Sequence, residues 1–195
     1  MAHFYYVRHG QTAWNAEHRI CGRRDIPLTE TGREQAAAVG KKILEEKIRI
    51  HEILCSPLSR ARETAQIISE ITGIPVRTDD RLIEQDFGIY EGTLNTAEAF
   101  LRDKEQFACS YEGGESMLRV AHRIYSLLEE IRPEAEAGKV YLLAAHNGLA
   151  RVVHTYFHDM SNEEFARHMI PNGELLRYEF PELPESGEDK TGGNA

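Results

Sequence analysis

Arginine or histidine follows closely on three short apolar runs of the sequence, at residues 4–7, 51–55 and 139–145. The side chains concerned are those of Arg8, His9, Arg60 and His146. An arginine offers a planar fork of N–H donors that matches the oxygens of a phosphate or carboxylate. A neutral imidazole has a lone pair that can attack phosphorus. These residue types can therefore hold and attack a phosphoryl group, whose oxygens carry negative charge during transfer.

Several other chemistries lack their motifs in this sequence. There is no Gly-x-x-x-x-Gly-Lys loop, no Gly-x-Gly-x-x-Gly, no Asp-x-Asp and no Gly-x-Ser-x-Gly elbow. A cysteine phosphatase needs arginine six positions after its cysteine, and those positions hold Pro27, Ala61 and Glu115. A phosphate-binding loop, a dinucleotide fold, an aspartyl phosphotransferase and a cysteine or serine nucleophile of these kinds are thus excluded.

An ordered series of longer motifs surrounds the candidate residues. It comprises Arg8-His9-Gly10-Gln11-Thr12-Ala13-Trp14-Asn15, Gly22-Arg23-Arg24-Asp25-Ile26-Pro27-Leu28-Thr29, Ser56-Pro57-Leu58-Ser59-Arg60-Ala61-Arg62-Glu63-Thr64-Ala65, Leu82-Ile83-Glu84, Phe87-Gly88-Ile89-Tyr90-Glu91-Gly92, Gly113-Gly114-Glu115-Ser116 and His146-Asn147-Gly148. The series resembles the histidine phosphatase superfamily, also called the phosphoglycerate mutase-like family, in its phosphatase branch. The matches run in family order from Phe4 to about Phe180, nearly the whole chain.

The resemblance implies a role for five catalytic residues. His9 is expected to be the nucleophile, with a nearby carbonyl, for which Gly10 is the candidate, fixing its tautomer. Arg8, Arg60 and His146 are expected to hold the phosphate. Glu84 matches the general acid of the family, and its carboxylate, once ionised, can activate water against the phosphohistidine.

The resemblance also implies a wider phosphate-binding set. Besides Arg8, Arg60 and His146, its members are Gly10, Gln11, Thr12, Asn15, Cys21, Gly22 and Asn147. Gly10 is expected to let the backbone pass close to the ligand. Asn147 stands where many members of the family have glycine. No metal or organic cofactor is implied, because arginine and histidine supply the positive charge.

Some residues near this set leave alternatives open. Asp86 and Glu91 compete with Glu84 for the acid role, and the position of Glu84 after Leu82-Ile83 favours it. Arg19, Arg23 and Arg24 form either a solvated basic loop or a rim that attracts a second acidic group of the substrate. His154 and His158 stand four apart, but Thr155 replaces the glutamate that the zinc-protease motif requires, so a helix-surface pair is expected.

Strands and helices must alternate to position these residues. The apolar runs named above, with residues 75–78 and 174–180, read as strands. Helical spacing covers residues 31–50, 58–72, 115–131, 149–157 and 162–169, with a weaker pattern at 94–108. In the first of these helices, Ala37, Gly40, Leu44 and Ile48 are assigned to the buried face. The pattern predicts a three-layer α/β/α sandwich with a mainly parallel sheet, whose ligands bind at the carboxyl ends of the strands.

Length, composition and charge bound the remaining possibilities. The 195 residues suit one domain, predicted at 1–180, with a lid-like insertion around 94–114 and a disordered acidic tail at 181–195. The formal net charge of −9 argues against a nucleic-acid or membrane-surface partner. Three widely spaced cysteines, with neither a signal peptide nor a membrane span, indicate a cytoplasmic protein. We expect a monomer or a homodimer.

The function expected from the sequence is hydrolysis of a phosphomonoester, acting on a small phosphorylated metabolite through a phosphohistidine. The alternative is a cofactor-dependent phosphoglycerate mutase, and a non-catalytic phospho-ligand-binding protein ranks below both. Family mutases carry an Arg-Leu-Asn-Glu-Arg-His-Tyr-Gly stretch and an extra segment over the site. Here residues 81–88 read Arg-Leu-Ile-Glu-Gln-Asp-Phe-Gly, which favours hydrolysis.

Overall fold

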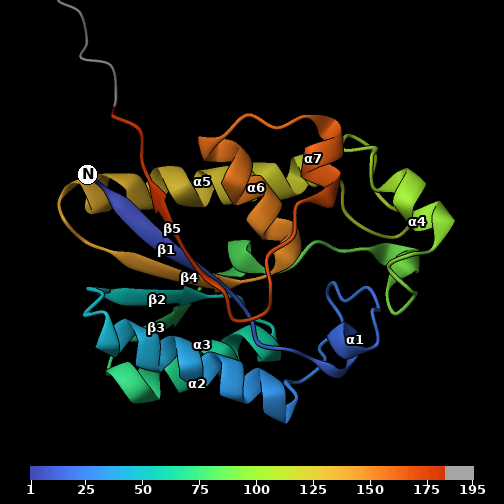
Figure 1. Cartoon of the computed structure of the whole chain (residues 1–195). Helices are drawn as coiled ribbons and strands as arrows, with labels where there is room; N and C mark the ends of the chain where they lie inside the picture. The colour runs from blue at the N-terminus through green and yellow to red at the C-terminus, as the bar shows by residue number, and fades with distance from the viewer. Residues whose placement is uncertain (183–195) are drawn as a thin grey trace, which may run out of the picture.

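A five-stranded sheet forms the middle layer of the computed structural model, which describes residues 1–182 (Figure 1). The strands are β1 (His3–Arg8), β2 (Glu52–Cys55), β3 (Val76–Thr78), β4 (Tyr141–Ala145) and β5 (Leu175–Glu179). Their order across the sheet is β3-β2-β4-β1-β5. All neighbouring pairs are parallel except β1 and β5, which are antiparallel. The predicted mainly parallel sheet is thus confirmed.

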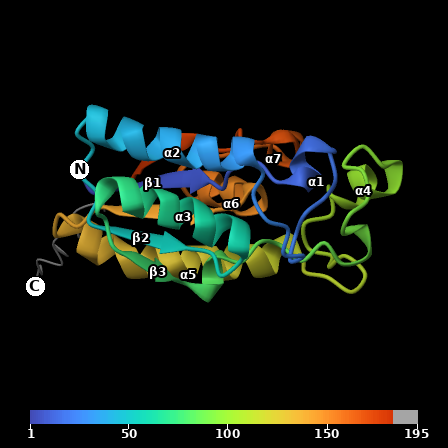
Figure 2. The ribbon, with the colours of Figure 1, turned by 90° about the horizontal axis from the view of Figure 1, so that it is seen from below.

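Helices cover both faces of this sheet, as Figures 1 and 2 show from two directions. On one face lie α2 (Glu30–Glu45) and α3 (Ser59–Thr72), and on the other lie α5 (Met117–Glu136), α6 (Asn147–Phe157) and α7 (Asn162–Arg167). Beyond one end of the sheet lie α1 (Ala13–Ala16) and α4 (Glu98–Asp103). Two short 3-10 helices, η1 (Asp80–Leu82) and η2 (Gly88–Tyr90), lie between β3 and α4 along the chain. This is the predicted three-layer sandwich.

Alternation along the strands divides the apolar side chains between two cores. Because successive strand residues point to opposite faces, Tyr6 and Leu143 enter the core beneath α5 and α6. Val7 and Leu142 enter the core beneath α2 and α3 instead. Burial on both faces explains why these strands read as continuous apolar runs in the sequence.

A third apolar cluster lies outside the sheet, at the end where α1 and α4 are found. It joins Ile20 with four aromatic residues, Phe87, Tyr90, Phe100 and Tyr111. These residues come from the loop after α1, from η2 and from the segment 94–114. The cluster therefore anchors that segment beside the carboxyl ends of the strands, although its expected action as a lid stays a prediction.

Two helices differ from the sequence expectation. The helix predicted at 31–50 ends at Glu45, because Lys47 adopts a positive φ of 53° and Ile48 donates its N–H back to Ile43. Its buried face is that of Ala36, Val39, Gly40 and Ile43, so the assignment of Leu44, which is 52% exposed, was wrong by one residue.

The helix predicted to stop at residue 131 continues through Pro133 to Glu136. Proline removes one backbone donor from a helix. Here Ile131 and Ala135 pack into the core on either side of Pro133, and this burial maintains the last turn.

No helix within residues 1–182 has the length and apolar character needed to cross a membrane. The predicted disordered tail lies outside the described residues from position 183 onward.

Candidate functional site

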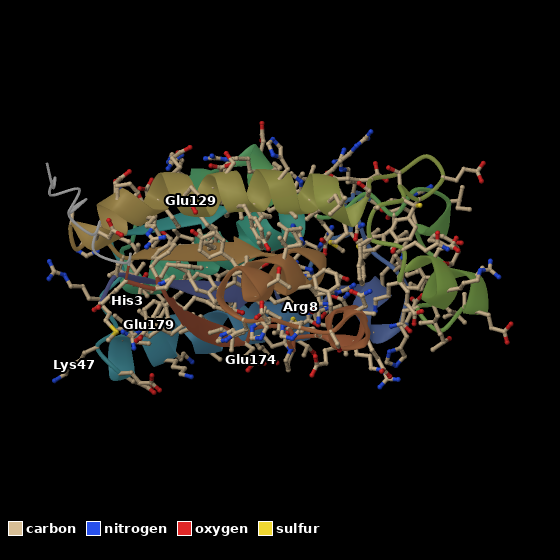
Figure 3. The ribbon with its side chains drawn as sticks, turned by 90° about the horizontal axis from the view of Figure 1, so that it is seen from above. His3, Arg8, Lys47, Glu129, Glu174 and Glu179 are labelled. Atoms are coloured by element: carbon tan, nitrogen blue, oxygen red, sulfur yellow. The ribbon has the colours of Figure 1, made fainter. Side chains whose placement is uncertain are left out.

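The carboxyl ends of the strands open into a cavity of about 700 Å³. Six of the predicted site residues line it: Arg8, His9, Asn15, Cys21, Glu84 and Asn147. Figure 3 shows Arg8 at the end of β1 that faces α1, away from His3 and Lys47 at the other end of the molecule. Two more predicted residues, Arg60 and His146, lie against His9 with no exposed surface.

His9 is held in one tautomer from both sides of its ring. Its Nδ1 lies 2.7 Å from the carbonyl oxygen of Gly10, and its Nε2 accepts a hydrogen bond from Arg60 Nε at 3.2 Å. The proton therefore sits on Nδ1, and the lone pair sits on Nε2. Burial, together with the charges of Arg60 and Arg8, holds the pKa of His9 well below its usual range. The expected tautomer-fixing contact with Gly10 is confirmed.

Arg60 is the second residue of α3 and is fully buried. Its two terminal nitrogens donate to the carbonyls of Gly22, at 2.7 Å, and Arg24, at 2.9 Å. These carbonyls fix the guanidinium beside His9. Gly22 therefore contributes to this site by positioning Arg60.

His146 lies at the N-cap of α6, with its ring centroid 5.1 Å from that of His9. Its Nε2 is 2.7 Å from the hydroxyl of Ser56, which itself accepts from the Leu58 N–H. The other ring nitrogen of His146, Nδ1, is buried and has no partner within residues 1–182. Burial and the charge of Arg60 lower the pKa of His146 well below its usual range. The lowered pKa favours a neutral His146, in contrast to the cation expected from the sequence.

Glu84 is buried at the edge of the cavity, 4% exposed. Its carboxyl accepts from the N–H groups of Gln85 at 2.8 Å and Gly148 at 3.1 Å. Burial outweighs these two contacts and raises the pKa of Glu84. A carboxyl with a raised pKa can remain protonated, as a general acid requires. The competing carboxylates serve the backbone instead: Glu91 accepts from Gly22 and Arg23, and Asp86 accepts from Gly88.

Gly148, one place later than the glycine of many relatives, makes room for Glu84. A Cβ at position 148 would lie 2.5 Å from Glu84 Oε1. Asn147 lines the cavity, and its side-chain oxygen accepts from the Ile170 N–H at 2.9 Å. The asparagine between His146 and Gly148 therefore ties the start of α6 to the loop that follows α7.

Arg8 faces the cavity from the last position of β1. One terminal nitrogen donates to the Ile170 carbonyl at 2.6 Å, whereas its Nε is buried and has no partner within residues 1–182. Burial lowers the pKa of Arg8 to about 10, so the guanidinium stays charged at neutral pH. Arg8 thus keeps donor capacity for an anion in the cavity.

Besides Arg60 and His146, four of the predicted phosphate-binding residues lie outside the cavity lining: Gly10, Gln11, Thr12 and Gly22. The Thr12 hydroxyl caps α1 by accepting from the Asn15 N–H, and the Gln11 side chain accepts from Thr29. Both side chains are therefore engaged in the loop itself.

Gly10 lies in close contact with the backbone at the start of α2. A Cβ at position 10 would lie 2.1 Å from the carbonyl oxygen of Gly32, at the start of α2. Gly10 accordingly permits close contact between two backbone segments, and its expected proximity to a ligand stays a prediction.

Replacing Gly10 with alanine is expected to lower the free energy of unfolding by about 1–3 kcal/mol, because the backbone of α2 must move away. Urea denaturation measures the change. Gly40→Ala is the matched control, since a Cβ there meets only the Ile71 side chain, at 3.0 Å. Equal midpoints for Gly10→Ala and the parent would contradict the contact.

Three residues that the sequence did not single out also support the site. Thr64 accepts from the Gly10 N–H and donates to the Arg60 carbonyl, Ser56 contacts His146, and Asn172 donates to the His9 carbonyl at 2.8 Å. Thr64 and Ser56 fall inside one of the quoted motifs. Asn172 comes from a turn 163 positions away from His9, for which no local pattern gives a signal.

The arginines of the loop after α1 were expected to form either a solvated basic loop or a rim of the site, and the structure places them differently from one another. Arg19 lines the cavity while it pairs with Glu17. Arg23 instead lies near Asp86 and Glu115. Of the three arginines, only Arg19 reaches the cavity.

Comparisons with known proteins agree with this geometry. The family model of the histidine phosphatase superfamily (branch 1) matches residues 4–183. The chain is 37% identical over 176 residues to 2,3-bisphosphoglycerate-dependent phosphoglycerate mutase 2 of Gloeobacter violaceus, covering 84% of this chain and 79% of that protein. It is 34% identical over 194 residues to a Yersinia pestis protein named "Probable phosphoglycerate mutase GpmB", covering 94% and 87%. The solved structure of mycobacterial glucosyl-3-phosphoglycerate phosphatase with VO3 aligns with a TM-score of 0.79 and 29% identity, over 91% of this chain and 92% of that chain.

Proposed function

The chain belongs to branch 1 of the histidine phosphatase superfamily, and we propose that it hydrolyses phosphomonoesters of small metabolites through a phosphohistidine at His9. One observation carries the proposal. A neutral His9 presents its Nε2 lone pair beside Arg60, while its Nδ1 proton is held by the Gly10 carbonyl. That arrangement is what nucleophilic attack on a phosphoryl group requires.

In the first step, the Nε2 lone pair of His9 attacks phosphorus as the ester P–O bond breaks. The Nε–H of Arg60, which donates to His9 Nε2 in this structure, must donate to a phosphate oxygen instead so that the lone pair is free to attack. Glu84 gives its proton to the leaving oxygen, because an alkoxide is a poor leaving group at neutral pH. The products are an alcohol, phospho-His9 and a Glu84 carboxylate.

In the second step, the Glu84 carboxylate takes a proton from water as the water oxygen attacks phosphorus. The P–N bond breaks and its electron pair returns to Nε2. Arg8 and Arg60 stabilise the negative charge in both steps, and the imidazole of His146 adds a hydrogen bond. Inorganic phosphate then leaves, and Glu84 is protonated again for the next cycle.

Transfer back to a sugar acid, in place of water, would make the chain a phosphoglycerate mutase. This second candidate is favoured by the names of the curated relatives from G. violaceus and Y. pestis. Hydrolysis is favoured by the mycobacterial phosphatase, a relative solved with VO3 and also with inorganic phosphate. It is favoured too by residues 81–88, which differ from the mutase stretch on both sides of Glu84.

The two candidates predict different products from 3-phosphoglycerate in the presence of 2,3-bisphosphoglycerate. We expect inorganic phosphate to be released, with little 2-phosphoglycerate formed. Phosphorus NMR follows both products in one sample. Rapid isomerisation with little free phosphate would overturn the hydrolase in favour of the mutase.

We further propose that the reaction needs no metal and takes place in the cytoplasm. Arg8 and Arg60 provide the charge stabilisation for which other phosphatases use a metal ion. The three cysteines, Cys21, Cys55 and Cys109, are free thiols, which fits a reducing compartment. We expect EDTA to leave the rate of p-nitrophenyl phosphate hydrolysis unchanged. Loss of this activity in EDTA would contradict the metal-free mechanism.

A further inference from the structure

Apart from Arg8, four cationic side chains line the cavity, and two of them, Arg151 and Lys104, are the more buried. Arg151 lies on α6 and is only 5% exposed. Lys104 is half-buried at the end of α4, with its ammonium 5.9 Å from the centre of the Phe100 ring. Both residues line the same cavity as His9 and Glu84. The catalytic cycle described above uses neither of them.

Both cations lack an anionic partner within residues 1–182. The Arg151 Nε is fully buried and unpartnered, and the buried Nε2 of His168, which also lines the cavity, has no partner either. By contrast, two more exposed arginines of the same lining do form ion pairs: Arg19 with Glu17, and Arg167 with Glu163. The lack of an anionic partner is therefore particular to Arg151 and Lys104.

Such an arrangement is costly for the protein alone. Burying a charge without a partner is destabilising, and Lys104 and Arg151 also repel each other. Burial, with the charge of Arg151 added, lowers the pKa of Lys104 to about 8, and burial lowers that of Arg151. Glu84 is the acidic residue of the lining, and burial raises its pKa, which favours the neutral form. An anionic ligand is what these groups lack.

We propose that Arg151 and Lys104 bind a second anionic group of the substrate, so that the substrates are compact phosphomonoesters that also carry a carboxylate or a second phosphate. The proposal rests on the function proposed above. Its geometry sets the size of the substrate: Arg151 is one helical turn, about 5 Å, along α6 from Gly148, whose N–H contacts Glu84. The second anionic group and the ester oxygen that Glu84 protonates must then fit together in one cavity of about 700 Å³.

Binding without turnover tests the proposal. The full chain carrying His9→Ala is titrated by calorimetry with 3-phosphoglycerate and with glycerol 3-phosphate, which differ only in carboxylate against hydroxymethyl. A second pair, fructose 1,6-bisphosphate and fructose 1-phosphate, tests a phosphate as the second group. We expect the doubly anionic member of at least one pair to have a dissociation constant about tenfold lower or more. Hydrogen bonds to charged groups contribute enough binding free energy for a ratio of this size. The pair that shows the preference identifies the second group.

Substitutions assign the preference to its residues. Arg151→Met is expected to bring the ratio of dissociation constants close to one, Lys104→Met to reduce it in part, and Arg151→Lys to keep most of it because the charge remains. Arg102→Gln, outside the cavity lining, is the matched control and should leave the ratio unchanged.

The proposal is overturned if neither pair shows a preference, if the preference survives Arg151→Met, or if Arg151→Lys abolishes it as fully as Arg151→Met does. Absence of hydrolysis by the parent enzyme would count against the proposed function alone, since these affinities are measured without turnover.

Discussion

Replacing His9 with alanine is expected to reduce kcat/KM for p-nitrophenyl phosphate by roughly four orders of magnitude or more, because the attacking atom is removed. The good leaving group of this ester makes the assay insensitive to the acid, so that it reports on the nucleophile. In the parent enzyme, the lowered pKa of His9 keeps the ring unprotonated well below neutral pH. Activity toward this ester should therefore persist under mildly acidic conditions and fall only when His9 becomes protonated.

The control for this experiment is His122→Ala, which removes an exposed imidazole from α5 and should retain parental activity. Thermal unfolding of both variants checks that the fold is intact. Hydrolysis by His9→Ala at the parental rate would mean that another group attacks phosphorus, and the mechanism proposed here would be wrong.

Glu84→Gln is expected to lower kcat/KM for an alkyl phosphate by about 10²- to 10⁴-fold, the range typical of general acid catalysis. The loss should be much smaller for p-nitrophenyl phosphate, whose leaving group departs without a proton. In the parent, the acid must be protonated, so kcat/KM for the alkyl ester falls as pH rises through the raised pKa of Glu84. Steady-state assays across the pH range measure both effects.

Glutamine cannot titrate, so this fall at high pH should be missing in Glu84→Gln. Glu98→Gln, which changes an exposed carboxyl at the start of α4, is the control and should behave as the parent does. Equal losses for the alkyl and aryl esters, or a pH dependence that survives the substitution, would remove Glu84 from the acid role.

Much of the fold could be predicted because its signals are local. Strands buried on both faces appear as short apolar runs, and Gly73 ends α3 with a left-handed φ of 75° where the sequence predicted the end. The ends of α2 and α5 could not be predicted in the same way. Burial of Ile131 and Ala135 outweighs the effect of Pro133, and a one-residue shift in the face of α2 depends on contacts with other elements.

The candidate site was predictable where motif order marks it, as at Arg8, His9, Arg60, Glu84 and His146. Their catalytic roles stay predictions until the variants above are assayed. Contacts between distant segments were not predictable: Asn172 reaches the His9 carbonyl, and Gly10 meets Gly32. Whether a charged residue has a partner also depends on the whole fold, which is why the unpaired Arg151 could not be predicted from the sequence.

The stereochemistry of hydrolysis at phosphorus tests the central claim, a covalent phospho-His9, most directly. A phosphate ester made chiral with oxygen isotopes is hydrolysed in water of a different isotope, and the configuration of the released phosphate is determined by NMR. Each in-line displacement inverts phosphorus. Two displacements, by His9 and then by water, predict overall retention of configuration. Inversion would show a single direct attack by water and would contradict the account.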